Sequence, residues 1–150
     1  MLRQERRKVN DMFRRIKFKI KMKIDDFRSR CQRFKRGWSY GDVWDIDAWF
    51  MTNIKPMLIH LRDHGIGIPM DLYQEGVENE RAAWEEVLTE MITCLDYMEE
   101  DFVLEKLGFY DGDGYKTMTK EDYEAVNNIM ESNKNRFFEL FSEHFYSLWD

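Results

Sequence analysis

The stretch Ile16-Lys-Phe-Lys-Ile-Lys-Met-Lys-Ile24 decides the fold class, because it fits two kinds of secondary structure. Its strict alternation of apolar and basic residues is typical of a β-strand. A longer window favours a helix, since apolar residues recur at steps of three and four and fall within an arc of about 80°. These residues, here named the apolar stripe, are Val9, Phe13, Ile16, Ile20, Ile24, Phe27, Cys31 and Phe34. Neither Gly nor Pro interrupts residues 1–36, so we expect one long helix there.

This expected helix is strongly basic, although the chain as a whole has a net charge of −6. Residues 1–36 hold fifteen Lys or Arg against four Asp or Glu, whereas residues 37–150 hold eight against twenty-five. The sequence therefore predicts a basic helical arm, residues 1–36, before an acidic helical body that is one globular domain, residues 37–150. A helix of this size spans about 50 Å, more than the roughly 40 Å diameter of a compact 150-residue domain. We expect the arm to project, to bend or to pack along another copy.

The arm has more than one interpretation. The narrow apolar stripe is typical of a helix–helix seam and favours a homo-oligomer. Adsorption on a membrane is the weaker alternative, because Phe18 and Met22 lie opposite the stripe. The basic residues could also contact the phosphates of a nucleic acid without reading its sequence, or could form a solvated face. The candidate anion contacts are Arg6, Arg7, Lys8, Arg14, Arg15, Lys17, Lys21 and Arg28.

An aromatic and acidic segment, residues 38–50, follows the arm. Indole faces can stack on a base or ring, and carboxylates can bind hydroxyls or amines, so this segment is a candidate pocket. The proposed ligand-binding residues are Trp38, Tyr40, Asp42, Trp44, Asp45 and Asp47. A purely structural interpretation stays open, because carboxylates are favoured at a helix N-terminus and Trp44 could anchor the core.

The rest of the chain predicts three further helices, giving an all-α fold of about four helices. The spacing of Ser39 and Asp42 predicts a helix from about residue 40, bent at Pro56 and ended by residues 65–69. Helical periodicity predicts another helix over residues 80–106. A second capping-box spacing, Thr119 to Asp122, predicts a helix to the C-terminus. The residues expected to face the core include Val43, Ile46, Phe50, Met57, Leu58, Leu61, Trp84, Leu88, Met91, Leu95, Phe102, Val126, Phe137, Leu140 and Phe145.

Signals for a cofactor, a metal or a catalytic group are incomplete. His60 and His64 lie one helical turn apart but lack a third ligand or a His-Glu-x-x-His pattern. Residues 111–122 echo a calcium-binding loop, yet Lys116 stands where the turn needs glycine. The two cysteines share no motif spacing, and no apolar run approaches the roughly 18 residues of a membrane span. We therefore predict no cofactor, no metal ligand, no catalytic residue and no transmembrane segment.

Several segments together resemble a family of small phage-encoded proteins. The matching elements are Gly37-Trp38-Ser39 with Asp42, Trp44 and Asp47, then Pro56-Met-Leu-Ile-His-Leu61, Gly67-Ile-Pro69, Glu80 with Trp84, and Phe145 to Asp150. The resemblance covers almost the whole chain, whereas residues 71–79 and the Asp-Gly-Asp-Gly segment depart from the family pattern. It implies a phage accessory protein in the bacterial cytoplasm, and it carries over no catalytic residue.

We therefore expect a non-enzymatic binding protein that serves a phage in counter-defence. It would block a host protein or sequester a nucleotide-type signal. One alternative is a nucleic-acid-associated protein that uses the basic arm. A second is a metal-dependent hydrolase built on His60, His64 and nearby carboxylates.

Overall fold

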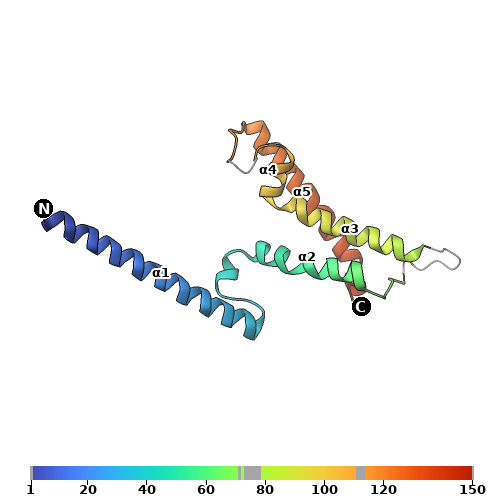
Figure 1. The fold of residues 1–150 in the computed structure, drawn as a ribbon. Coiled ribbons are helices and arrows are strands. Elements are labelled where there is room, and N and C mark those ends of the chain that lie inside the picture. Colours follow the sequence, from blue (N-terminus) through green and yellow to red (C-terminus); the bar gives the residue numbers. More distant parts are fainter. Residues whose placement is uncertain (1, 71, 73–78, 111–113, 150) are drawn as a thin grey trace. The chain divides into compact units, whose positions relative to one another are not determined.

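The fold is all-α, as the sequence predicts (Figure 1). The computed structural model describes residues 2–70, 72, 79–110 and 114–149, with side chains from residue 12 onward. Its elements are α1 (Leu2–Arg36), η1 (Gly41–Trp44), α2 (Ile46–His64), α3 (Glu80–Met98), α4 (Glu100–Lys106), α5 (Lys120–Glu143) and η2 (Phe145–Ser147), where η marks a 3-10 helix. The described part contains no strand, only an isolated bridge between Tyr110 and Tyr115.

The ambiguous stretch that begins at Ile16 is helical, so the long-window prediction is confirmed. At 1.5 Å per residue, the 35 residues of α1 span about 52 Å. Gly37 ends the helix, because its φ of 80° suits glycine and its N–H still bonds to the Arg33 carbonyl at 2.8 Å.

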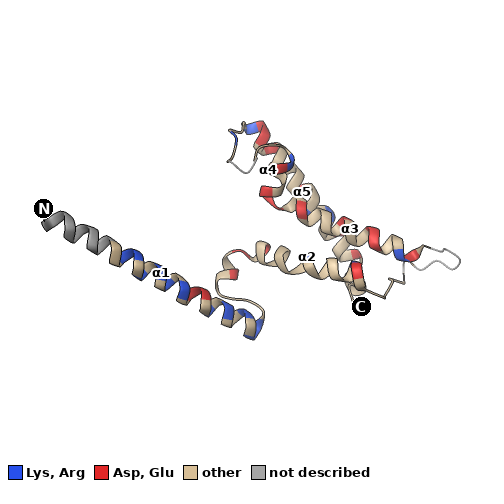
Figure 2. Ribbon diagram, in the orientation of Figure 1, with Lys and Arg blue, Asp and Glu red and all other residues tan. Residues whose placement is uncertain are grey.

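The chain forms two compact units, unit 1 of residues 1–49 and unit 2 of residues 50–150. The boundary lies inside α2, thirteen residues beyond the end of the predicted arm. Unit 1 therefore contains α1, the loop that follows it, η1 and the first turn of α2. Lys and Arg dominate α1, whereas Asp and Glu are frequent on the helices of unit 2 (Figure 2).

Unit 2 is held by two clusters of buried apolar side chains. The first joins α2, α3 and α5 and contains Leu58, Leu61, Trp84, Leu88, Met91, Ile92, Cys94, Leu95, Phe137 and Leu140. The second contains Val103, Leu104 and Val126 and joins α4 to α5. The sequence identified most of the first cluster correctly, because its residues follow a helical period.

The predicted helix over residues 80–106 is wrong in one respect, since the structure breaks it at Glu99. That residue is extended, with φ −84° and ψ 119°, and it separates α3 from α4. In one continuous helix, Val103 and Leu104 would lie about 120° and about 220° round the axis from Met91. The break allows both of them to be buried against Val126 instead.

The start of the second helix was also predicted too early. The chain passes through η1, and α2 begins at Ile46 rather than near residue 40. Four of the residues expected in the core, Val43, Ile46, Met57 and Phe145, are exposed. Trp44 is 91% exposed, so it is no core anchor in the described structure. The helix continues through Pro56 without interruption.

Candidate binding surfaces

Asp42 fastens the loop after α1 to the last turns of that helix. The Arg33 guanidinium donates hydrogen bonds to both carboxylate oxygens of Asp42, one of them at 3.1 Å. The backbone N–H of Ser39 donates to the same carboxylate at 2.7 Å. These contacts, that of Arg33 first, hold the pKa of Asp42 well below its usual range. Half of the predicted capping box therefore forms, but it closes a loop rather than starting α2.

Arg36 contacts both aromatic side chains of the same loop. Its guanidinium lies 3.8 Å from the ring centroid of Trp38 and 4.2 Å from that of Tyr40. Its Nε also donates to the Trp38 carbonyl at 3.0 Å, and the Gln32 side chain accepts from the Tyr40 N–H at 2.9 Å. The structure thus brings together three of the six predicted ligand-binding residues, Trp38, Tyr40 and Asp42. Each of the three contacts α1, and the Trp38 ring also packs edge-on against that of Tyr40, with centroids 5.9 Å apart.

The other three predicted ligand-binding residues, Trp44, Asp45 and Asp47, are exposed at η1 and the start of α2. The Asp47 carboxylate accepts from the N–H of Ala48 at 2.9 Å, as expected near a helix N-terminus. The hollows described next are lined by residues of unit 2, and none of the six belongs to them. That the six residues form a ligand pocket stays a prediction.

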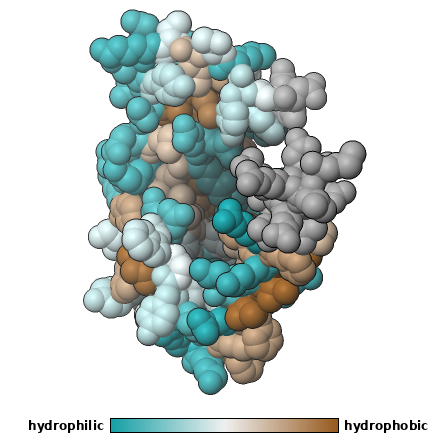
Figure 3. All heavy atoms as spheres, turned by 90° about the vertical axis from the view of Figure 1, so that its left-hand side faces the viewer, coloured by the Kyte–Doolittle hydropathy of each residue, from teal (hydrophilic) through white to brown (hydrophobic). Residues whose placement is uncertain are grey.

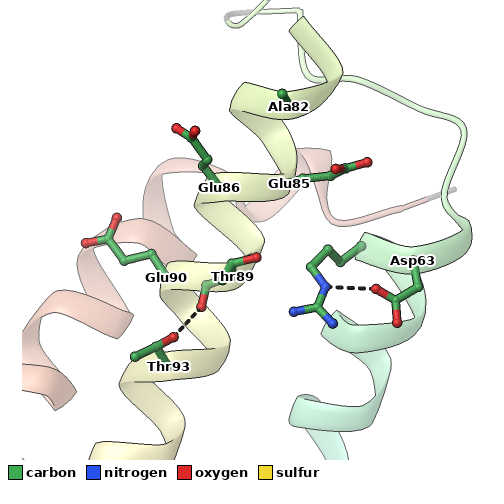
Figure 4. A pocket seen from close by; sticks show the side chains of 8 residues that line it. Asp63, Ala82, Glu85, Glu86, Thr89, Glu90 and Thr93 are labelled. Carbon is green, nitrogen blue, oxygen red and sulfur yellow. Dashed lines mark hydrogen bonds and ion pairs between the residues drawn. The ribbon is translucent and has the colours of Figure 1, made fainter. Parts of the chain in front are cut away.

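An acidic hollow of about 800 Å³ lies between α2 and α3 (Figure 4). It is lined by Arg62, Asp63, Ala82, Glu85, Glu86, Thr89, Glu90 and Thr93. Most of its carboxylates have cationic neighbours: Arg62 pairs with Asp63, Arg81 with Glu85 and Arg136 with Glu90. The sequence gave no sign of this hollow, since the hollow depends on how α2 lies beside α3.

A second hollow of about 400 Å³ is mainly apolar. It is lined by Ile54, Pro56, Met57, Leu58, His60, Leu61, Leu148 and Trp149, from α2 and the C-terminal segment.

On the face shown in Figure 3, hydrophobic side chains reach the surface as separate patches among hydrophilic ones.

The histidine and calcium-loop signals acquire no further ligands in the described residues. The His60 and His64 rings stack with centroids 4.6 Å apart, and no group of three His, Cys, Asp or Glu is placed there to hold a metal. In the calcium-like loop, residues 111–113 lie outside the described residues, while Asp122 caps α5. Cys31 is exposed; Cys94 is buried, and burial raises the pKa of its thiol.

The apolar stripe of α1 is open to solvent from Phe13 onward, the part whose side chains the structure describes. The bulky stripe residues Phe13, Ile16, Ile20, Ile24, Phe27 and Phe34 are between 44% and 93% exposed. The candidate anion contacts Arg14, Arg15, Lys17, Lys21 and Arg28 are exposed as well, while the side chains of Arg6, Arg7 and Lys8 lie outside the described residues.

The loop of unit 1 leaves this stripe uncovered, because it holds α1 from another side. Its contacts on α1 are Gln32, Arg33 and Arg36, which lie about 120° to 220° round the helix from Ile20. Unit 1 is therefore built with its loop on the polar side of α1 and its apolar stripe outward.

Comparisons of the chain with protein-family models, curated proteins and solved structures find no match. Among the described helices, none is both long and apolar enough to cross a bilayer. A proposal about its function must therefore rest on the surfaces described above.

Proposed function

We propose that this protein is a binding protein whose helix α1 docks on an anionic partner. The observation that carries the proposal is the exposed, unbalanced charge of α1. Residues 12–36 hold eleven Lys or Arg against two Asp. Arg30 pairs with Asp26 and Arg33 with Asp42, and no other Lys or Arg among the described side chains of α1 forms an ion pair. The lysines at positions 17, 19, 21 and 23 have no acidic partner in the described part of the chain.

The geometry favours α1 over the aromatic and acidic segment as the binding surface. Asp42 already accepts hydrogen bonds from Arg33 and Ser39, and Trp38 and Tyr40 already stack on Arg36. A ligand there would have to replace these contacts. The basic side chains of α1 between Arg14 and Lys23 are exposed to solvent instead, and an acidic remainder of the chain confines attraction for anions to this helix.

The resemblance to phage-encoded proteins gives this binding a setting. In that setting the protein is an accessory factor that reaches its host target through α1, without chemistry of its own. Blocking a host component requires only that α1 occupies an anionic surface on which that component depends.

Salt-dependent binding tests the proposal. The full chain is offered duplex DNA and, separately, vesicles that contain anionic lipid. At least one of them should bind, and binding should weaken as salt is added. For duplex DNA the affinity should fall by about 10³-fold between roughly 50 and 200 mM salt if about six phosphates are neutralised.

A matched pair of charge reversals locates the surface. Lys17→Glu with Lys21→Glu should abolish binding, whereas Lys120→Glu with Lys134→Glu on α5 makes the same change in net charge and should leave binding intact. Equal loss in both double variants, or no binding to either probe at low salt, would refute the docking role of α1.

A further inference from the structure

Helix α1 presents a surface of two chemical kinds. The apolar stripe runs along it, and cations border the stripe on both sides. Taking Ile20 as the centre, Lys17 and Lys35 lie about 60° to one side and Lys23 about 60° to the other. Arg28 and Arg30 lie farther out, at about 80° on opposite sides. A partner that fits must supply apolar volume under the stripe and negative charge along both of its edges.

Two occupants satisfy only half of this requirement. A nucleic acid offers phosphates but would leave the Ile and Phe side chains of the stripe in water. A second α1, paired along the stripe, would bury those side chains. It would also bring Lys17, Lys23 and Lys35 next to the cations of its partner, where coiled coils place opposite charges. The charge pattern therefore disfavours the self-pairing that the stripe alone suggests.

The acidic unit of a second copy fits no better. Its hollow between α2 and α3 offers carboxylates, but Ala82 is the only aliphatic residue in the lining. The hollow that ends at Leu148 and Trp149 is apolar, but no carboxylate lines it. Neither surface joins apolar volume to negative edges.

We propose that the occupant of the stripe is the surface of an anionic membrane, on which α1 lies in the plane of the interface. Acyl chains would receive the Ile and Phe side chains, while anionic head groups would meet the lysines and arginines that border them. This inference depends on the proposed function and names the class of its anionic partner. Phe18 and Met22, on the opposite side, stay in water and provide an internal control.

The test uses the full chain and vesicles of phosphatidylcholine alone or of phosphatidylcholine and phosphatidylserine in equal parts. The wild type should sediment with the mixed vesicles, less at high salt, and not with phosphatidylcholine alone. Ile20→Gln with Ile24→Gln should weaken binding about a hundredfold, because two large apolar side chains no longer enter the bilayer. Phe18→Gln with Met22→Gln removes similar apolar area from the other face and should bind like the wild type.

A fluorescence measurement covers the case in which the glutamine variants lose helicity. Cys31 lies on the stripe and is exposed, whereas Cys94 is buried, so an environment-sensitive thiol dye can be placed at Cys31 of the otherwise unchanged chain. Its emission should shift to the blue with the mixed vesicles. The same dye on Cys31→Ser with Met22→Cys should show no shift.

Any of the following results would overturn the membrane inference. Binding to duplex DNA without binding to vesicles would leave the proposed function standing and replace the membrane with nucleic acid. Concentration-dependent dimerisation that Ile20→Gln with Ile24→Gln abolishes, without vesicle binding, would assign the stripe to a second copy. Equal weakening by both glutamine pairs, with no dye shift at Cys31, would show that the stripe does not enter the bilayer. Failure of the Lys17 and Lys21 reversals to affect any anion binding would remove the proposed function itself.

Discussion

Among single residues, Asp42 determines how unit 1 is closed. Its carboxylate accepts hydrogen bonds from the Arg33 guanidinium and the Ser39 N–H, so one side chain links the last turns of α1 to the turn after Gly37. Because the pKa of Asp42 is lower in the folded chain than in the unfolded chain, the ionised form stabilises this turn. The stabilisation is complete above the unfolded pKa of about 3.9 and is lost as the pH falls from there towards the folded pKa.

Asp42→Asn should therefore loosen the turn at neutral pH in the way that acid loosens it in the wild type. We expect a lower hydrogen-exchange protection factor at the Ser39 and Tyr40 amides, measured by NMR with correction for intrinsic exchange. The variant should lose the fall in protection that the wild type shows on acidification below about pH 4. Asp45→Asn, at an exposed carboxylate nearby, should keep the wild-type profile. Unchanged protection at Ser39 in Asp42→Asn would contradict this role.

Two neighbouring phenylalanines of α5 differ in burial, and we expect their alanine variants to differ in stability. Phe137 is fully buried in the first core cluster, whereas Phe138 is 45% exposed. Phe137→Ala should lower the free energy of unfolding by about 3–5 kcal/mol, because removing the buried ring leaves a cavity in the core. Phe138→Ala should cost clearly less, since part of its ring already contacts water. Urea titrations of both variants measure the difference, and equal midpoints would contradict the packing.

Among the elements, α5 begins at a complete capping box. The Thr119 hydroxyl accepts from the Asp122 N–H at 3.2 Å, and the Asp122 carboxylate accepts from the Thr119 N–H at 2.8 Å. Thr119→Ala should reduce the free energy of unfolding by about 1 kcal/mol. Thr117→Ala, the same change two residues earlier, should have little effect, and thermal or urea unfolding can compare the two. A loss as large at Thr117 would show that the cap is not the cause.

These elements also show what local sequence can and cannot predict. The capping box at Thr119 and the helical period of α1 are local signals, so the sequence located both helices. The break at Glu99 has no local signal, because no Gly or Pro stands near it and the gain comes from burying Val103 and Leu104 against Val126, far along the chain. The same limit explains Ser39 and Asp42, where Arg33 captures the carboxylate that was expected to start a helix.

At the scale of the whole molecule, the candidate surface was only partly predictable. The charge asymmetry and the apolar stripe are visible in the sequence, and the proposed docking role of α1 rests on these two features. The side of α1 that the following loop occupies depends on contacts of Gln32, Arg33 and Arg36, which no periodicity reveals. That loop decides which side of the helix stays open, and the charges at the border of the stripe then limit what can cover it.

The two units differ in how they are stabilised, and removing α1 separates their contributions. Both core clusters consist of residues from Phe50 onward, whereas Ser39 is the one buried residue among the described side chains of unit 1. A chain of residues 37–150 should therefore keep the urea midpoint of the full chain, because its buried apolar area is unchanged. Its far-UV circular dichroism should lose the share of helix that α1 supplies. A lower midpoint, or unfolding in a different number of steps, would show that unit 2 needs α1 to fold.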